Sequence, residues 1–253
     1  LQEMNLDASF RVFQDRFQDA GDFSFFFVGN FDLEEIKPLV EIYLGSLSAT
    51  GRNETWRDVR MEMPDGIVEN TVRKGMEPKS MVHLSFNGDF DWNVNNRYEL
   101  KSLEGVMDIK LREIMREDMG GTYGVWTWTS SEHYPKENYQ FNVMFGCSPE
   151  NVDILTQALF TQIDSVRSFG IDDEYIAKVQ EKQRQAREVE LQENKFWVDS
   201  ISNYYYHGED PLQILNYDKL VDKLSVDAIQ SAARKYLDTN QYVKVVLYPE
   251  AVE

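Results

Sequence analysis

The sequence predicts an α+β fold in which helices pack on one face of a mainly antiparallel sheet. Strand-like segments come in neighbouring groups joined by polar turns, whereas helix-like segments follow one another in blocks. The length of 253 residues allows one large domain or two modest ones, and 42% hydrophobic residues supply enough apolar material for a core.

The first 47 residues are predicted to form a helix, a strand and a second helix. Apolar residues recur at near-helical spacing from Phe10 to Phe17. Residues 23–28 are continuously apolar, which predicts a central, buried strand. Asp32 stands where a helix N-cap is expected, and Gly45 ends the helix that follows.

Residues 48–64 mix Ser, Thr, Gly, Asn and charged residues without a sustained period, which predicts an exposed linker. The sequence therefore predicts two bodies, at 1–47 and 65–253, joined by a linker at 48–64.

The unit at 65–253 begins with strands and ends with a strand. In chain order we predict strands at 67–73 and 81–86, a long helix at 93–119, a hairpin of strands at 122–133 and 139–147, helices at 152–169, 172–193 and 196–206, a helix starting near Ser225, and a strand at 242–248. In the strand 81–86, apolar residues at 82, 84 and 86 share one face, and His83 lies on the other with its neighbours 81 and 85.

The charge balance argues against nucleic-acid binding. Lys and Arg number 26 against 44 Asp and Glu, giving a net charge of −18 that repels a phosphate backbone. No apolar run approaches the roughly 18 residues that span a bilayer. We therefore expect a soluble chain without a membrane span.

The single cysteine and the first residue add two expectations. Cys147 cannot form an internal disulfide and is expected to be a buried small hydrophobe, so it leaves the compartment open, with a periplasmic or exported location among the options. A chain that opens at Leu1 without a signal peptide is expected to be a piece of something longer.

A metal site is not expected in this chain. His83, His133 and His207 are not spaced to put two imidazoles on one helical face. The nearest approach to an H-x-x-E-H motif is Thr129 to His133, where Thr occupies the first ligand position and the segment is strand-like. Nucleophilic triads and phosphate-binding glycine loops are also without support.

The junction between the long helix and the hairpin is the strongest candidate site. Arg116 stands near the helix C-terminus and Tyr123 opens the strand seven residues later, with Gly120 and Gly121 between them, so the two side chains are able to converge. The alternative is structural: an Arg in a last helical turn favours the helix dipole, and a Tyr at a strand start is common.

These residues resemble a known family. The segment Leu111 to Val125, with Arg116, Gly120 and Tyr123, is similar to the R-x-x-x-x-G-x-Y type signature of the pitrilysin family of zinc peptidases, which are inverzincins. Residues 25–34 with 43–47 resemble the other familiar stretch of that family, a strand, Gly, acidic turn and helix ending in Y-x-G-x-L. The resemblance implies the processing-peptidase-like metallohydrolase fold. It also implies that residues 1–47 are the tail of one α+β homology unit and that residues 65–253 are a complete, C-terminal homology unit.

The resemblance also implies roles. Family members carry zinc on an H-x-x-E-H helix in an N-terminal unit, so zinc would belong to the full-length enzyme and be bound outside this chain. Arg116 and Tyr123 match the pair that reaches the substrate carbonyl, and Trp126 and Trp128 are weaker candidates for substrate contacts. The implied partners are the N-terminal catalytic half, in the same polypeptide or in a partner subunit, and a peptide substrate.

Two functions remain open at this point. The first is the C-terminal, substrate-binding portion of a zinc endopeptidase, inactive by itself. The second is a non-catalytic relative that holds peptides or serves as a structural subunit. The substrate, the cleavage preference, the oligomeric state and the upstream motif stay undecided.

Overall fold

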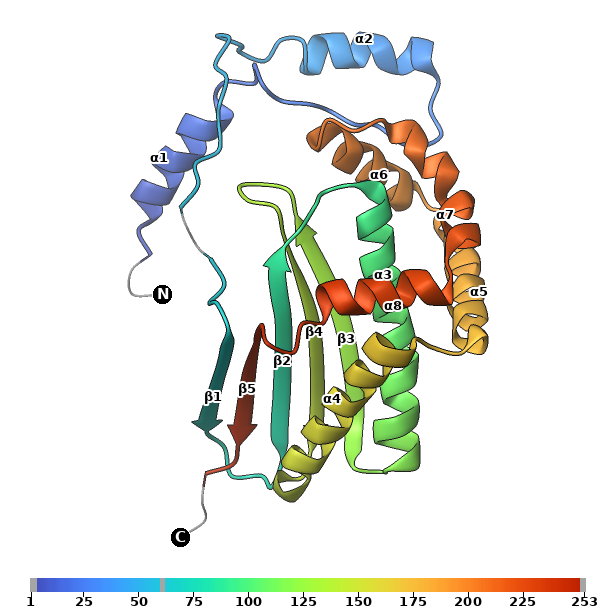
Figure 1. The fold of residues 1–253 in the computed structure, drawn as a ribbon. Helices are drawn as coiled ribbons and strands as arrows, with labels where there is room; N and C mark the ends of the chain where they lie inside the picture. Colours follow the sequence, from blue (N-terminus) through green and yellow to red (C-terminus); the bar gives the residue numbers. More distant parts are fainter. Residues whose placement is uncertain (1–3, 60–61, 251–253) are drawn as a thin grey trace. The chain divides into compact units, whose positions relative to one another are not determined.

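A five-stranded sheet organises the larger of two units into which the chain separates. The structure is a computed structural model that describes residues 4–59 and 62–250 (Figure 1). The larger unit consists of the described residues of Asp58–Val189 and Leu212–Glu253. The smaller unit consists of the described residues of Leu1–Arg57 and Glu190–Pro211.

The sheet is mixed but mainly antiparallel. Its strands are β1 (Ile67–Arg73), β2 (Ser80–Asp89), β3 (Thr122–Glu132), β4 (Asn138–Cys147) and β5 (Tyr242–Tyr248), in the spatial order β1-β5-β2-β4-β3. The β1 and β5 strands pair in parallel, and the other three pairs are antiparallel. The predicted fold class and the predicted hairpin are confirmed.

The core lies between one face of this sheet and three helices. Alternate residues of β2, Val82, Leu84 and Phe86, are fully buried, as the predicted alternation requires. The helices α3 (Val94–Leu111), α4 (Val152–Phe169) and α8 (Val226–Tyr236) cover this face (Figure 1). Cys147 is 1% exposed, and its burial raises the pKa of the thiol to about 11.

Further helical segments of the larger unit are η2 (Pro149–Asn151), α5 (Asp173–Glu190), η3 (Pro211–Asn216) and α7 (Tyr217–Lys223). The bounds of α5 and η3 each run one residue past those of the unit. Ile176 and Val179 of α5 and Val221 of α7 belong to the same core. The helical segments η3 and α7 were not predicted, because each is short and has a single buried residue, Ile214 and Val221, so neither shows a helical apolar period.

The predicted long helix at 93–119 is two helices of different type. Asn93 Oδ1 accepts the backbone N–H of Asn96 at 2.9 Å and caps α3. After Leu111 the chain continues as the π-helix η1 (Arg112–Asp118), and Met119 N donates to Ile114 O, five residues back. The apolar spacing runs through this change, so periodicity did not signal it.

The smaller unit holds the helices α1 (Leu6–Phe17), α2 (Leu33–Tyr43) and α6 (Asn194–Tyr206). The N-cap predicted at Asp32 is confirmed, because its Oδ1 accepts the N–H groups of Glu34 at 2.7 Å and Glu35 at 3.2 Å. Residues 190–211 belong to this unit through contacts such as Phe26 with Tyr205, whose ring centroids are 5.3 Å apart.

The buried strand predicted at residues 23–28 is wrong. This segment has no regular secondary structure, and Phe23, Phe25 and Phe27 are 37%, 47% and 49% exposed. A strand needs a neighbouring strand for its backbone N–H and C=O groups. The described residues of the smaller unit supply none, so apolar composition alone did not produce a strand.

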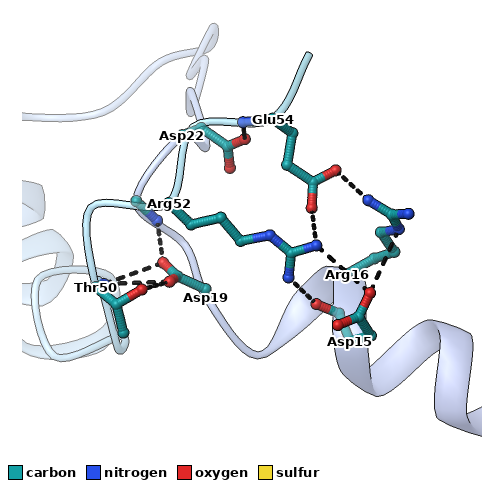
Figure 2. Close-up of polar contacts among 8 residues, drawn as sticks. Asp15, Arg16, Asp19, Asp22, Thr50, Arg52 and Glu54 are labelled. Atoms are coloured by element: carbon teal, nitrogen blue, oxygen red, sulfur yellow. Dashed lines mark hydrogen bonds and ion pairs between the residues drawn. The ribbon is translucent and has the colours of Figure 1, made fainter. Parts of the chain in front are cut away.

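The first part of the predicted linker is tied to the smaller unit. Asp19, which is 7% exposed, accepts the N–H of Thr50 at 3.2 Å and also the Thr50 hydroxyl (Figure 2). Arg52 Nη1 donates to the carbonyl of Asp15 at 2.5 Å, and Arg52 also pairs with Glu54. Residues 48–54 therefore have more contacts than an exposed linker was expected to have.

The two units described here are defined by contacts between residues and not by homology. The division into homology units at 1–47 and 65–253, with a linker at 48–64, therefore stays a prediction. Residues 1–3, 60–61 and 251–253 of those ranges lie outside the described residues. Among the helices of the described residues, none is long and apolar enough to cross a membrane.

Candidate functional site

Met119 and two glycines join η1 to β3. Gly120 has a φ of +61°, a conformation that residues with a Cβ rarely adopt. Gly121 lies against α4, where a Cβ would come within 3.1 Å of Leu155 Cδ2. These two positions allow a short bend, so the turn that carries Arg116 stays close to the first residues of β3.

A β-bulge presents Tyr123. Thr122 pairs with Cys147 and Gly124 pairs with Gly146, which leaves Tyr123 as an extra residue on β3. Thr122 Oγ1 donates to the carbonyl oxygen of Gly146 at 2.6 Å and accepts the N–H of Gly124 at 3.1 Å. The bulge is thus fixed on both sides, and Tyr123 is 64% exposed.

The sheet face opposite α3, α4 and α8, here called the outer face, carries the predicted aromatic residues. The Tyr123 ring lies beside Gly146, where a Cβ would be 3.7 Å from Tyr123 Cδ2. Trp126 and Trp128 follow on the same face and are 48% and 38% exposed. The structure therefore places Tyr123, Trp126 and Trp128 together on one exposed surface.

The structure adds polar neighbours that the sequence analysis did not assign to the site. His83 stacks on Trp128 with ring centroids 5.3 Å apart, and its Nε2 is 3.0 Å from Asn142 Oδ1. Lys79 donates to Glu77 Oε2 at 2.8 Å, which raises the pKa of its ammonium, and the charge of Tyr123 adds a smaller effect in the same direction. The alternation at 81–86 already placed His83 on the face of the strand opposite the core, and could have indicated its place at the site.

Arg116 is exposed on η1, which packs against β3. No residue in the described part of the chain forms an ion pair or hydrogen bond with its guanidinium. Its neighbours are engaged: Arg112 pairs with Asp108, and Glu113 accepts from Tyr175 and Lys178. That Arg116 and Tyr123 meet on one substrate stays a prediction.

Comparison with known proteins identifies the family. Residues 7–183 match the family model described as the peptidase M16 inactive domain. The chain belongs to the peptidase M16 family. The resemblance to pitrilysin-type peptidases is thereby confirmed, and the match is to the inactive domain.

Several relatives of this M16 chain are zinc proteases by name. The "Probable zinc protease PqqL" of Haemophilus influenzae is 26% identical over 228 residues, covering 88% of this chain and 24% of the relative. The crystal structure of the periplasmic protease PqqL from Escherichia coli aligns with a TM-score of 0.73 at 20% identity, over 88% of this chain and 25% of that one. An M16 inactive domain from Pseudomonas fluorescens aligns with a TM-score of 0.74 at 13% identity, over 99% of this chain and 59% of that one.

The M16 chain spans about a quarter of the length of the curated relatives it matches. The solved structures, at 20% identity and below, show the shared fold. The processing-peptidase-like architecture expected from the sequence is therefore confirmed at the level of the fold.

The described residues of this M16 chain do not fit a zinc ion. Among residues 4–59 and 62–250 there is no group of three or more His, Cys, Asp or Glu side chains that could hold a metal. His83 contacts Asn142, and His133 Nδ1 lies 3.0 Å from Glu137 while its ring stacks on Trp92 at 5.2 Å. Each of these imidazoles is used in local structure, and a tetrahedral ligand set is not assembled around either of them.

Proposed function

We propose that this chain is the substrate-binding portion of an M16 zinc endopeptidase. In this proposal the zinc belongs to another half, in the same polypeptide or in a partner subunit. The observation that carries it is the bulge that exposes Tyr123 on the outer face, in the strand that follows the turn with Arg116, whose guanidinium has no ion pair or hydrogen bond among the described residues.

The chemistry of this pair suits peptide hydrolysis. Negative charge develops on the oxygen of the scissile carbonyl, and hydrogen-bond donors held in place stabilise that charge. The Tyr123 hydroxyl supplies one neutral donor, and Arg116 supplies a positive charge with several N–H donors in a fixed plane. Zinc, held outside this chain, supplies Lewis-acid activation of water when bound.

The outer face supplies a surface for the rest of the peptide. Trp126 and Trp128 are half-exposed, and the stacking of His83 on Trp128 holds that indole in one orientation. Fixed aromatic rings bind side chains with little loss of conformational entropy. We assign them to contacts with residues flanking the scissile bond.

Exposed apolar residues on α1 of the smaller unit indicate a surface that another part of the protein covers. Leu6, Phe10, Phe13 and Phe17 lie on one stripe of α1 and are 54% to 82% exposed, and α1 has no buried residue among those described. An apolar stripe of this size on a helix marks a surface that another part of a protein covers. We assign it to a further part of the M16 protein.

The location is proposed by analogy. The Escherichia coli relative is described as a periplasmic protease. We propose a periplasmic or exported location for this chain.

Photo-crosslinking of a peptide to the complete protease tests the proposed function. Peptides that carry a benzophenone side chain are bound after zinc has been removed by chelation, so that they are held without being cleaved, and the labelled residues are found by mass spectrometry. We expect labels within residues 116–128. Labels confined to other segments would contradict the proposal, and binding without cleavage after zinc is restored would indicate the non-catalytic, peptide-holding relative.

A further inference from the structure

We infer that a contact between Glu113 and Tyr175 keeps Arg116 unpaired and therefore available to the peptide, an inference that rests on the proposed function. Tyr175 on α5 donates its hydroxyl to Glu113 Oε2 at 2.5 Å, and Lys178 Nζ lies 3.4 Å from Glu113 Oε1. These three residues are called the Glu113 clamp below. In this inference, Glu113, Tyr175 and Lys178 act as positioning residues for Arg116.

Two lysines, one on α3 and one on α5, hold the Tyr175 ring in place. The ammonium groups of Lys110 and Lys178 lie 5.5 Å and 5.2 Å from the centroid of the Tyr175 ring. The hydrogen bond to Glu113 raises the pKa of Tyr175 to about 12, so the phenol keeps the proton it donates. The same bond lowers the pKa of Glu113, which stays an anion at neutral pH.

The need for the clamp follows from the local sequence. The segment Arg112–Asp118 contains three acidic residues, and Glu113 precedes Arg116 by three positions. In an α-helix, residues three or four apart are neighbours, and a carboxylate there pairs with a guanidinium. In this protein the segment is a π-helix, Glu113 is bonded to α5, and Arg116 has no partner among the described residues.

The inference predicts what happens when the clamp is opened. With Tyr175 changed to Phe, Glu113 loses its strongest donor and is free to turn to Arg116, where it competes with the peptide. We expect kcat/KM to fall about tenfold, the order expected for losing a hydrogen bond to a charged group. A neutral amide at position 113 cannot form an ion pair with Arg116, so Glu113→Gln should stay within about threefold of the wild type.

The decisive variant is the double change Tyr175→Phe with Glu113→Gln. If the harm of Tyr175→Phe comes from a released carboxylate, removing that charge should restore kcat/KM to within about threefold of wild type. A contact that merely holds the two helices together would make the double variant as poor as Tyr175→Phe or worse. Rescue therefore separates the two explanations.

Tyr98→Phe is the matched control. Tyr98 on α3 also donates its hydroxyl to a residue of α5, Gln183, whose Oε1 lies at 2.7 Å, but it has no contact with Glu113. Its loss should lower the thermal midpoint and leave kcat/KM unchanged.

The measurement is steady-state cleavage of an internally quenched peptide pool of randomised sequence by the complete protease, with a thermal melt for each variant. Unchanged kcat/KM in Tyr175→Phe, or no rescue in the double variant, would overturn the inference. Arg116→Ala separates its failure from that of the proposed function. If Arg116→Ala is harmless, both fail, whereas if it is harmful and Tyr175→Phe is not, the inference alone fails.

Discussion

Thr122 Oγ1 donates a hydrogen bond of 2.6 Å to the carbonyl oxygen of Gly146 on the neighbouring strand. The same oxygen accepts the N–H of Gly124, so one hydroxyl fixes both sides of the bulge that presents Tyr123. Thr122→Val should lower the free energy of unfolding by about 1 to 2 kcal/mol, because two partly buried backbone groups lose a partner. Urea unfolding checks this value, with Thr122→Ser as the control that keeps the hydroxyl. Equal stability of the Val and Ser variants would contradict this explanation of the bulge.

Gly120 and Gly105 should respond to alanine with opposite signs. Gly120 has a positive φ and open space around it, so Gly120→Ala is expected to cost about 1 kcal/mol through backbone strain alone. Gly105 lies within α3, where a Cβ meets Val179 methyl groups at 3.6 Å, an ordinary contact. Gly105→Ala should therefore stabilise the protein by up to about 1 kcal/mol. Thermal melts of the two variants check the pair, and a stabilising Gly120→Ala would show that the bend does not need glycine.

Much of the larger unit was predictable from sequence because its elements carry their own signals. The alternation at 82, 84 and 86 placed β2 correctly, and the pair Gly120-Gly121 marked the end of a helix. Asp32 marked a helix start in the smaller unit for the same reason, since its side chain bonds its own neighbours.

Features that depend on distant residues were not predictable. The strand expected at 23–28 failed because pairing requires another strand, which apolar composition does not report. The π-helix at Arg112–Asp118 keeps the apolar spacing of an α-helix, and Glu113 meets Tyr175 across 62 residues. At the candidate site, Tyr123 was recognised from a motif, whereas the bulge that exposes it depends on pairing with β4.

Asp19 should hold residues 48–54 in place within the smaller unit, and this effect should depend on pH. Its pKa is lowered, chiefly by the hydrogen bond from the Thr50 hydroxyl, so the contribution of this group to stability is present above the pKa of an unfolded Asp, about 4. It is lost as the pH falls further, through the lower pKa of the folded state. At neutral pH, Asp19→Asn should make the Thr50 amide exchange hydrogen faster. Exchange measured by mass spectrometry checks this, with Asp7→Asn on α1 as the charge-matched control, and equal exchange in both variants would refute it.

The isolated chain should bind no stoichiometric zinc and hydrolyse no peptide. The described histidines are not arranged as a ligand set, and without the metal there is no activated water. Metal analysis after mild chelation checks the first expectation. One tightly held zinc per chain that is lost in His133→Ala would contradict the proposal that another half of the protease binds the zinc.

The assignment of Tyr123 to the substrate carbonyl is tested most directly by the steady-state rate of peptide cleavage by the complete protease carrying Tyr123→Phe, measured beside its thermal melt. We predict that kcat falls by about 10²-fold, the usual order for losing one preorganised donor to a developing oxyanion. The melting temperature should barely change, because Tyr123 is 64% exposed and the ring remains. Arg116→Lys should also be poorly tolerated, because an ammonium lacks the planar fork of a guanidinium. A wild-type kcat in Tyr123→Phe, or a loss of rate that follows the loss of folded protein, would contradict the assignment of Tyr123 to the substrate carbonyl.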